Sequence, residues 1–330
     1  MGCCQANSEK ANLQLNENPL NTKEEERQNH NIEYEHKDDS ELDQSELGII
    51  ENHIPTPDYA LPTLSMPKVT NANIKSRLDE LGAYQYGHDR EDDSKLPFFE
   101  PFILLSDGSI YKGQWRLGFR HGKGSCIWPG GAHYEGYWQD DRPDGHGRKI
   151  FENGDYYIGE WVNGIYYGKG VFHCKEWEYD GEWTDGKPHG YGKKKSANGD
   201  YYEGNFSMGQ RKGEGKQTWA DGTRYEGIFD KDRMDGQGTC KWVDGRSYEG
   251  IWKDGKMSGK GIFKWKDGSL YNGEYLNDKK HGFGIMEWPD GRKYEGTWKV
   301  DKMDGKGVMK ESDGKIIRGE WNLGKLVTDK

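Results

Sequence analysis

Aromatic residues and glycines recur along this chain at a fixed spacing. A Tyr is followed two residues later by Gly and two residues after that by another aromatic residue, and this phrase starts ten times between residues 111 and 321. Eight of the nine intervals between starts are 23 residues, the interval from Tyr157 to Tyr179 is 22, and the last start has Ile317 in place of Tyr. A fixed period of this size indicates a linear array of small units rather than a compact enzyme core.

When the Tyr is numbered as position 1, each repeat contains two runs with the periodicity of a β-strand. Positions 1, 3 and 5 alternate as aromatic, Gly and aromatic, and position 5 is aromatic in all ten repeats, from Trp115 to Trp321. Positions 12 and 14 are Gly in all nine complete repeats, and position 18 is often Trp, with the same parity. Because alternation at period two is typical of a strand, each repeat is expected to be a β-hairpin.

Two kinds of connection are expected between these strands. Positions 20 and 21 read Asp-Gly in five repeats, for example Asp244-Gly245, and Asn-Gly in two more. Such pairs accept positive φ at both residues, so we expect a two-residue type I′ turn there. Position 8 is Gly or Asp in every repeat, as in Asp141 and Gly255, and indicates a turn in a longer loop inside each hairpin.

The expected fold is all-β, an elongated single-layer antiparallel meander of tandem β-hairpins. Two strands per repeat at ~4.8 Å each predict a rod of roughly 90 Å with right-handed twist. Gly at positions 3 and 14 is expected to let a neighbouring ring lie flat on the backbone. Residues 174–178 replace the Asp-Gly turn and are one residue short, and Ser196 stands where a Trp is expected. We therefore expect a kink or bulge in this region and a gap in the aromatic row.

The chain is expected to divide into three segments. Residues 1–70 form an acidic leader, expected to be disordered because it cannot bury a core. Residues 71–97 form a short helix and linker that cap the array. Residues 98–330 form the repeat array, with a half repeat, nine full repeats and a terminal half repeat.

The capping helix is expected from apolar residues at helical spacing. Ile74, Leu78 and Leu81 fall on one side of a helix, with Asn73 as an N-cap and Gly82 as a stop. We expect this helix to cover the first exposed edge of the sheet.

Composition and charge agree with this division. Apolar residues are 32%, mean hydropathy is −1.12, and all 13 Trp and all 10 Phe lie after residue 95. Residues 1–95 carry 9 Lys/Arg and 20 Asp/Glu, a net charge of −11, and the rest carries 38 and 37, a net charge of +1. A nearly neutral array without a nucleic-acid motif argues against nucleic-acid binding. The sequence has neither a secretory signal nor an apolar run long enough to span a bilayer, and five Cys with no paired spacing in the array fit a reducing cytosol.

The first residues, Met1-Gly2-Cys3-Cys4, match an acylation signal. Gly2 is a candidate for myristoylation after removal of Met1, and Cys3 and Cys4 are candidates for palmitoylation. A second acyl chain makes membrane anchoring stable where a single myristoyl chain does not. The usual signal has Ser or Thr at residue 6, where this chain has Ala6. The alternative is an unmodified disordered terminus.

The repeated phrase resembles the MORN repeat family. Tyr248-Glu249-Gly250-Ile251-Trp252, with Gly255, Gly259 and Gly261, follows the pattern Tyr-Glu-Gly-x-Trp-x-x-Gly-x-x-x-Gly-x-Gly, and the resemblance covers about residues 98–327. It implies an elongated single-layer β-sheet and a non-catalytic role. MORN arrays act in membrane junctions, cilia and cytoskeletal scaffolds, and some have been linked to phosphoinositide binding. They also occur beside catalytic domains, for which we expect no room in this chain.

Two sets of array residues are candidates for binding. Position 9 is usually basic, and this row would meet lipid headgroups or be neutralised by its neighbours; its members are Arg142, Lys187, Arg233, Lys256, Lys279 and Lys302. The aromatic–Gly side of a single layer is expected to remain partly open as a groove for a helix or an extended peptide. The alternative is that its rings only hold the sheet together. The candidate groove residues are Trp219, Tyr225, Phe229, Trp242, Tyr248, Trp252, Trp265, Tyr271, Trp288, Tyr294 and Trp298.

No catalytic, metal or cofactor site is expected. Cys126, Cys174 and Cys240 lie in repeats one, three and six, about 20 Å or more apart at the rise of the array, so they cannot share a metal. The Gly-x-Gly pairs follow turns and do not open helices, so they are not phosphate loops.

These observations predict a non-catalytic scaffold on the cytoplasmic face of a plasma or ciliary membrane or at the cell cortex. It would be anchored by acyl groups and would recruit a protein partner through the groove. One alternative is a phosphoinositide-binding module that contacts anionic lipid directly. Another is a structural component of a ciliary or cortical cytoskeleton.

Overall fold

The computed structural model describes residues 63–64, 71–87 and 93–327. The chain divides into two units, residues 1–51 and 52–330, and every described residue belongs to the second. Most of the predicted leader, with Gly2, Cys3 and Cys4, lies outside the described residues. In the described part of the chain, no helix is long and apolar enough to cross a membrane.

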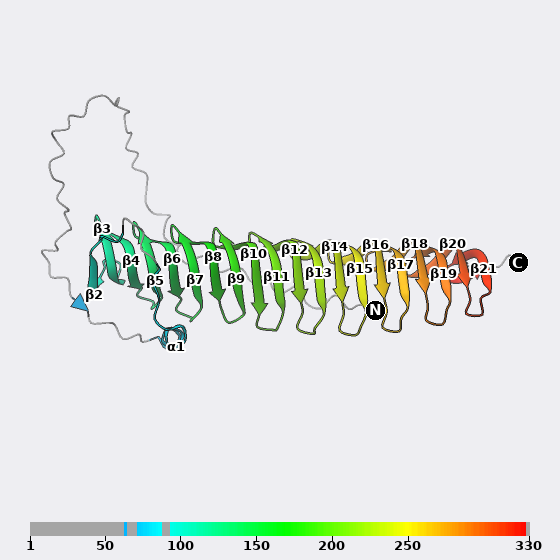
Figure 1. The fold of residues 1–330 in the computed structure, drawn as a ribbon, viewed down its shortest axis with the longest axis horizontal. Coiled ribbons are helices and arrows are strands. Elements are labelled where there is room, and N and C mark those ends of the chain that lie inside the picture. The colour runs from blue at the N-terminus through cyan, green and yellow to red at the C-terminus, as the bar shows by residue number, and fades with distance from the viewer. Residues whose placement is uncertain (1–62, 65–70, 88–92, 328–330) are drawn as a thin grey trace, which may run out of the picture. The chain divides into compact units, whose positions relative to one another are not determined.

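The described strands form one antiparallel meander in which each strand pairs with the next along the chain (Figure 1). At ~4.8 Å between strands, a sheet of this kind extends for about 100 Å. The predicted all-β meander is confirmed. The strands are β1 (Thr63–Leu64), β2 (Phe98–Leu104), β3 (Ile110–Arg116), β4 (Phe119–Ile127), β5 (His133–Gln139), β6 (Arg142–Ile150), β7 (Tyr156–Val162), β8 (Ile165–His173), β9 (Trp177–Thr184), β10 (Lys187–Ser196), β11 (Tyr201–Ser207), β12 (Gln210–Thr218), β13 (Arg224–Asp230), β14 (Arg233–Lys241), β15 (Ser247–Lys253), β16 (Lys256–Lys264), β17 (Leu270–Leu276), β18 (Lys279–Glu287), β19 (Lys293–Lys299), β20 (Lys302–Lys310), β21 (Ile316–Asn322) and β22 (Lys325–Val327).

Each Tyr ring lies over the two glycines of its own hairpin. A Cβ built on Gly238 would lie only 2.5 Å from Cζ of Tyr225, so no larger residue fits beneath the ring. The Tyr225 hydroxyl donates a hydrogen bond to the Ile228 carbonyl oxygen at 3.0 Å, and all nine position 1 tyrosines make the equivalent bond. The prediction that glycines at positions 3 and 14 accommodate a ring is therefore confirmed.

The two turn types are the reverse of the prediction. Asp254 and Gly255, at positions 7 and 8, have φ values of 49° and 79°, and their neighbours Lys253 and Lys256 pair directly. This is a two-residue type I′ turn, and positions 7 and 8 have positive φ in all ten repeats.

The Asp-Gly connection between repeats is a type I turn that ends in a left-handed Gly. Of Asp244 and Gly245, only Gly245 has positive φ, at 92°, and its N–H donates to the Trp242 carbonyl oxygen at 3.1 Å. The Asp244 carboxylate accepts the backbone N–H of Arg246 at 3.1 Å, which holds the Asp in its usual right-handed region. The prediction of a type I′ turn here was wrong because Asp-Gly is compatible with both geometries.

The irregular third repeat does not interrupt the sheet. Strands β8 and β9 pair from Gly168 to His173 without a register shift, so the predicted bulge was wrong. The Cys174 N–H donates to the Trp177 carbonyl oxygen at 2.9 Å and closes a short turn. Trp177 lies directly opposite Ser196 and packs 4.9 Å from the Phe172 ring. Trp177 therefore fills the gap in the aromatic row that Ser196 was expected to leave.

Helix α1 spans Ala72–Leu81. It begins two residues before the start expected for a helix capped by Asn73. Its N-cap is Asn71, whose side chain accepts the N–H groups of Asn73 and Ile74, and Gly82 ends it as expected. The prediction of Asn73 as the N-cap was wrong because Asn71, two positions upstream, accepts the first free amide groups, including that of Asn73 itself.

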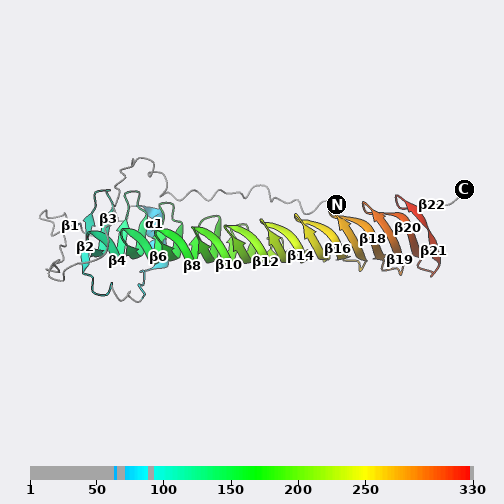
Figure 2. The ribbon, with the colours of Figure 1, turned by 90° about the horizontal axis from the view of Figure 1, so that it is seen from above.

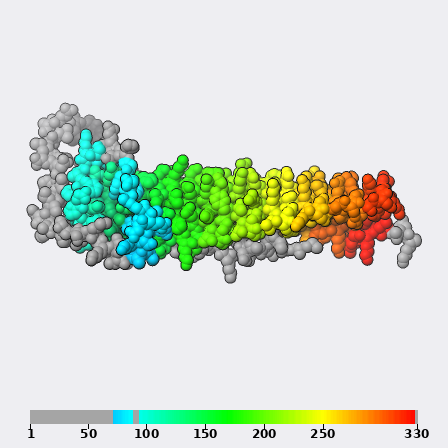
Figure 3. All heavy atoms as spheres, turned by 60° about the horizontal axis from the view of Figure 1, so that its bottom comes forward, coloured from blue at the N-terminus to red at the C-terminus, as the bar shows by residue number. Residues whose placement is uncertain are grey.

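Helix α1 does not cover the first edge of the sheet. The edge strand β2 pairs instead with β1. Helix α1 lies beside the first repeats (Figure 3), where Asn71 donates to the Glu152 carbonyl oxygen at 2.9 Å and Arg77 to that of Gly154 at 3.1 Å. The helix therefore caps the turns at the start of the array rather than its first strand.

Candidate partner-binding surface

The register of the hairpins places a defined set of side chains on each side of the sheet. Tyr248 pairs with Phe263 and Trp252 with Met257, so positions 1, 5, 10 and 16 share one side. We call this side, together with positions 3, 14 and 18, the aromatic face, and the other side the opposite face. The strands bow along their length (Figure 2).

Seven of the eleven predicted groove residues are buried in the aromatic face. Tyr248 and Trp252 are 0% and 1% exposed, although no second layer of the described chain covers this face. Rings interlock edge to face within and between repeats, as Tyr225 does with Phe229 of its own repeat at 5.1 Å and with Trp252 of the next at 5.6 Å between centroids. These rings form the core of the sheet rather than its surface. The seven are Tyr225, Phe229, Tyr248, Trp252, Tyr271, Tyr294 and Trp298.

The other four groove residues are half-exposed tryptophans at position 18. Trp219, Trp242, Trp265 and Trp288 pack against the buried cluster and keep part of each indole accessible. Each begins a turn between repeats, so they form a row along one margin of the aromatic face. This row, rather than the predicted groove as a whole, is the aromatic surface that a partner can reach.

A set of cations on the aromatic face was missed by the sequence analysis. The guanidinium of Arg120 lies 4.5 Å from the Trp138 ring, and Lys280 Nζ lies 4.5 Å from the Trp298 ring. The cations of this set occupy positions 10 and 16. Because the glycines at positions 12 and 14 have the same parity, the sequence alone could have placed these cations on the aromatic face. The full set is Arg120, Lys149, Lys194, Arg211 and Lys280, each over at least one ring.

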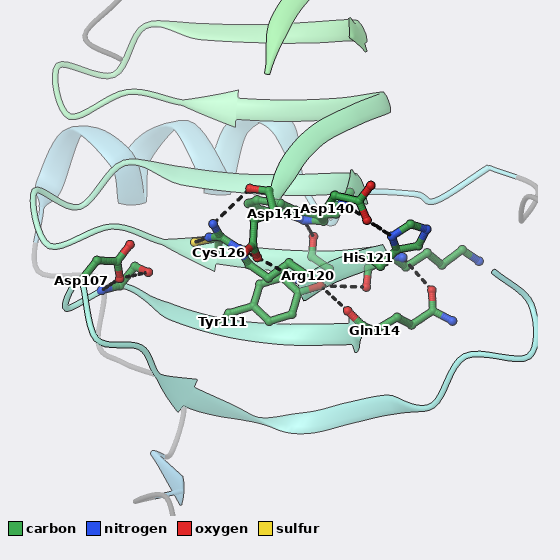
Figure 4. Close-up of polar contacts among 12 residues, drawn as sticks. Asp107, Tyr111, Gln114, Arg120, His121, Cys126, Asp140 and Asp141 are labelled. Carbon is green, nitrogen blue, oxygen red and sulfur yellow. Dashed lines mark hydrogen bonds and ion pairs between the residues drawn. The ribbon is translucent and has the colours of Figure 1, made fainter. Parts of the chain in front are cut away.

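The arginines and lysines of this set differ in their polar contacts. Arg120 Nε donates to Asp141 of the next repeat at 3.0 Å, and its Nη1 approaches Cys126 Sγ at 3.5 Å (Figure 4). Arg211 is held by Asp232 in the same way, at 3.1 Å. Burial lowers the pKa of Lys149, Lys194 and Lys280, because the rings displace water from each ammonium group.

The predicted position 9 cations lie beside the type I′ turns, away from the aromatic rows. Arg233 pairs with Asp254 at 3.1 Å and Lys279 with Asp301 at 3.0 Å, so two of the six are neutralised by the next repeat. The other four, Arg142, Lys187, Lys256 and Lys302, are exposed.

The three cysteines of the array are separated and buried. Cys126, Cys174 and Cys240 are buried thiols in different repeats, and burial raises the pKa of Cys126 to about 11. Among the described residues, no group of three His, Cys, Asp or Glu side chains is placed to hold a metal ion.

On the opposite face, the segment that follows α1 covers repeats one and two. We call residues 82–87 and 93–97 the N-terminal strap. The Tyr84 hydroxyl hydrogen-bonds to His146 Nδ1 at 2.8 Å, and Arg148 Nη1 donates to the Gly82 carbonyl oxygen at 2.8 Å. Gln114 Nε2 donates to the carbonyl oxygens of Asp93 and Leu96. The strap contacts the opposite face through these residues.

Comparison with known families identifies the repeat. The MORN repeat model matches nine ranges, which together include more than half of the chain. The ranges are 111–133, 134–156, 157–177, 179–201, 202–224, 225–245, 248–270, 271–291 and 294–315. The chain belongs to the MORN repeat family. MORN repeats are generally non-catalytic, so this array is a repeat scaffold or binding module.

The solved structures that resemble this MORN array do so weakly. The TCP10 domain of Danio rerio CPAP is 16% identical, with 62% of this chain and 98% of that chain covered, at a TM-score of 0.34. A Drosophila melanogaster SAS-4 TCP domain, solved with a proline-rich motif of Ana2, is 12% identical, with 73% and 94% covered and a TM-score of 0.27. Because these TM-scores are low, nothing about a partner of the MORN array is inferred from either domain. No curated protein matches this chain.

Proposed function

We propose that this MORN protein is a non-catalytic scaffold that recruits a protein partner on its aromatic face. We further propose that acyl groups at Gly2, Cys3 and Cys4 hold it on the cytoplasmic side of a membrane. The observation that carries the first part is the row of half-exposed tryptophans, Trp219, Trp242, Trp265 and Trp288. Tryptophan is enriched among the residues that dominate protein–protein binding energies.

The structural role of the rings does not account for this row. Tyr at position 1 and the ring at position 5 are already buried, and they contact the glycines and each other. The position 18 tryptophans pack against this cluster, but each also leaves part of its indole in water, which a partner would remove. A partner bound along the row would bury several indoles at once.

Proximity labelling in the native cell tests this proposal. We expect proteins labelled by the wild-type protein to be lost with the double substitution Trp242→Ala and Trp265→Ala. The matched control is Phe283→Ala, which removes a ring that is 50% exposed on the opposite face. If the labelled proteins are the same for all three forms, the aromatic face does not recruit them.

The membrane part of the proposal is tested separately. Substitution Gly2→Ala removes the N-terminal Gly that the myristoylation signal requires and should move the protein from the membrane fraction to the soluble fraction. Substitution Cys3→Ser with Cys4→Ser should leave only weak, reversible binding. Unchanged partitioning of Gly2→Ala would contradict acyl anchoring.

Direct recognition of anionic lipid is a second candidate, because four position 9 cations are exposed. The Gly2→Ala chain, mixed with phosphoinositide liposomes at low and high salt, distinguishes the two. Strong binding that high salt abolishes would support lipid recognition, since exposed charges are screened by salt. We expect no such binding.

A further inference from the structure

We infer that the opposite face of repeats one and two is a binding site for a peptide segment with two tyrosines, and that the N-terminal strap is its intramolecular ligand. This site is separate from the tryptophan row, so the inference goes beyond the proposed function. It is carried by the contacts that hold the strap and by residues of repeats one and two that depart from the pattern of the other repeats.

Side chains of repeat two bind the first part of the strap by its backbone. Arg148 Nη1 donates to the Gly82 carbonyl oxygen at 2.8 Å, and the Tyr137 hydroxyl donates to that of Gly87 at 2.9 Å. Both acceptors are main-chain oxygens, which a segment of any sequence supplies. The strap forms neither helix nor strand between these two bonds, so the site accepts a segment without regular secondary structure.

Two tyrosine rings anchor the strap between these bonds. The Tyr84 ring stacks on His146 with centroids 6.1 Å apart, and the Tyr86 ring packs edge to face on Tyr137 at 6.1 Å. Burial raises the pKa of both hydroxyl groups. Gln85, between the two rings, is exposed. The strap therefore binds through two rings that are one residue apart, and the residue between them faces solvent.

Two cations of the site favour aromatic side chains at these two places. The guanidinium of Arg148 lies 5.7 Å from the centre of the Tyr84 ring, and Lys123 Nζ lies 5.7 Å from that of Tyr86. A cation over the face of a ring is attracted by the negative potential of the π system. An aliphatic side chain offers no such attraction, so the site selects aromatic residues over aliphatic ones.

The residue at position 4 distinguishes repeat one from later repeats. In repeats three and four this residue is Glu160 or Glu182, and its carboxylate accepts a backbone N–H of its own repeat. Gln114 Oε1 makes the equivalent bond in repeat one. Its Nε2 also donates to the carbonyl oxygens of Asp93 and Leu96, at 2.8 and 3.0 Å. A glutamate would make only the first bond, so the amide at this position fits a role in holding the strap.

The bound strap leaves two buried polar atoms unsatisfied. Asp93 is 2% exposed, and its Oδ2 has no hydrogen-bond partner in the part of the chain that the structure describes. The same is true of Nε of Arg148. A buried polar atom without a partner is destabilising, and water would satisfy both atoms if the strap left. This cost weakens the closed form and allows another segment to replace the strap.

A labelled peptide with the sequence of residues 82–97 tests the inference on the full-length protein. The first receptor carries Tyr84→Ala and Tyr86→Ala, which weaken its own strap and leave the site intact. We expect the peptide to bind this receptor about tenfold more tightly than it binds the wild type, measured by fluorescence anisotropy. The wild-type strap competes because its tether gives it a high effective concentration. A peptide with both tyrosines changed to alanine should not bind.

A matched pair of substitutions locates the binding. Gln114→Glu, added to the first receptor, retains the bond to the Lys123 N–H but places a carboxylate oxygen against two carbonyl oxygens of the ligand, so binding should be lost. Glu160→Gln makes the reverse exchange at position 4 of repeat three, which does not contact the strap, and should retain binding. Circular dichroism checks that the sheet is folded, and Tyr84→Ala alone is the substitute if the double variant unfolds.

Three results would overturn the inference. The first is equal binding of the peptide to the wild type and to the strap variant, or binding to neither. The second is binding that survives Gln114→Glu. The third is loss of binding with Trp242→Ala, which would place the peptide on the aromatic face. Because the proposed function is tested on that face by other variants, it stands or falls separately from this site.

Discussion

At the scale of single residues, the array repeats one arrangement of a Tyr and two glycines. The ring occupies the space that two Cβ atoms would need, and the hydroxyl donates to a carbonyl oxygen three residues on. The same residue thus supplies apolar burial and satisfies a backbone acceptor in a layer that no second sheet covers in the described part of the chain. Both properties of the Tyr can be tested.

The contact between ring and glycine is tested by Gly238→Ala. The new Cβ would lie 2.5 Å from Tyr225 Cζ, so the ring must move out of its site. We expect a loss of about 1–3 kcal/mol in the free energy of unfolding, measured by thermal or urea denaturation. Gly87→Ala is the control, because a Cβ there would meet nothing within 4 Å. Equal stability of the two variants would contradict the account of Tyr packing.

The buried hydroxyls predict unfolding at alkaline pH. Burial raises the pKa of all nine position 1 tyrosines, and that of Tyr202 to about 12. Because these folded pKa values exceed the unfolded value of about 10, the stability they contribute is fully present below pH ~10. It is lost as pH rises toward 12 and beyond. Tyrosinate absorbance and the circular dichroism of the sheet should change together, and tyrosinate in a folded sheet would contradict this.

At the scale of elements, the sequence predicted the hairpins but reversed their turns. The strands could be predicted because the alternation of aromatic residues and Gly has period two, and this period does not depend on contacts with adjacent repeats. The turns could not, because Asp244-Gly245 fits both turn types, and the choice depends on a hydrogen bond from Arg246 to the Asp244 carboxylate. Similarly, Trp177 and Ser196 hold unrelated positions in the repeat pattern. Only the strand register shows that they lie opposite each other and that Trp177 fills the gap in the aromatic row.

The candidate surface was predicted only in part, for a similar reason. The sequence identified the rings, but their burial depends on how adjacent repeats interlock, which alternation alone does not specify. It also assigned binding to the position 9 cations, because charge at a loop is easy to recognise in a sequence. The cations at positions 10 and 16, such as Lys194, share the parity of the glycines at positions 12 and 14, but that they lie over rings follows only from the pairing of positions 5 and 10, and 1 and 16, across the hairpin.

The type I′ turns predict a stabilising substitution. Val300 is 59% exposed and has a φ of 48°, a conformation that a β-branched residue adopts only with strain. Val300→Asn should raise the free energy of unfolding by about 1 kcal/mol, measured by urea denaturation. Val243→Asn is the control, since Val243 is 71% exposed in the other kind of turn and its φ is not positive. A gain with Val243→Asn alone would contradict the turn assignment.

At the scale of the folded unit, the two ends of the sheet are secured differently. Its N-terminal end has β1, α1 and the N-terminal strap, and Ile74 of α1 is only 1% exposed. Its C-terminal end has β22, a strand of three residues that are all exposed. Because each repeat contacts only its neighbours, stability is expected to vary along the array.

Hydrogen exchange tests this difference. We expect slow exchange in β3 to β8 and faster exchange in β20 to β22, where the short, exposed strand β22 allows fraying. Ile74→Ala should increase exchange near residues 129–132, where a Cβ on Gly131 would lie 3.1 Å from Ile74, and leave repeats six to nine unchanged. Uniform exchange along the array, or a change at its far end, would contradict local coupling.

The constant register from one hairpin to the next has a consequence for the size of the ligand. Each additional unit lengthens the accessible indole row by about 9.6 Å without altering the units on either side. Removal of residues 248–270 would join two compatible strands and delete one indole of the accessible row, Trp265, together with the buried Trp252. For a partner bound along this row, the number of repeats would therefore set the length of the bound segment, independently of the residues that determine its specificity.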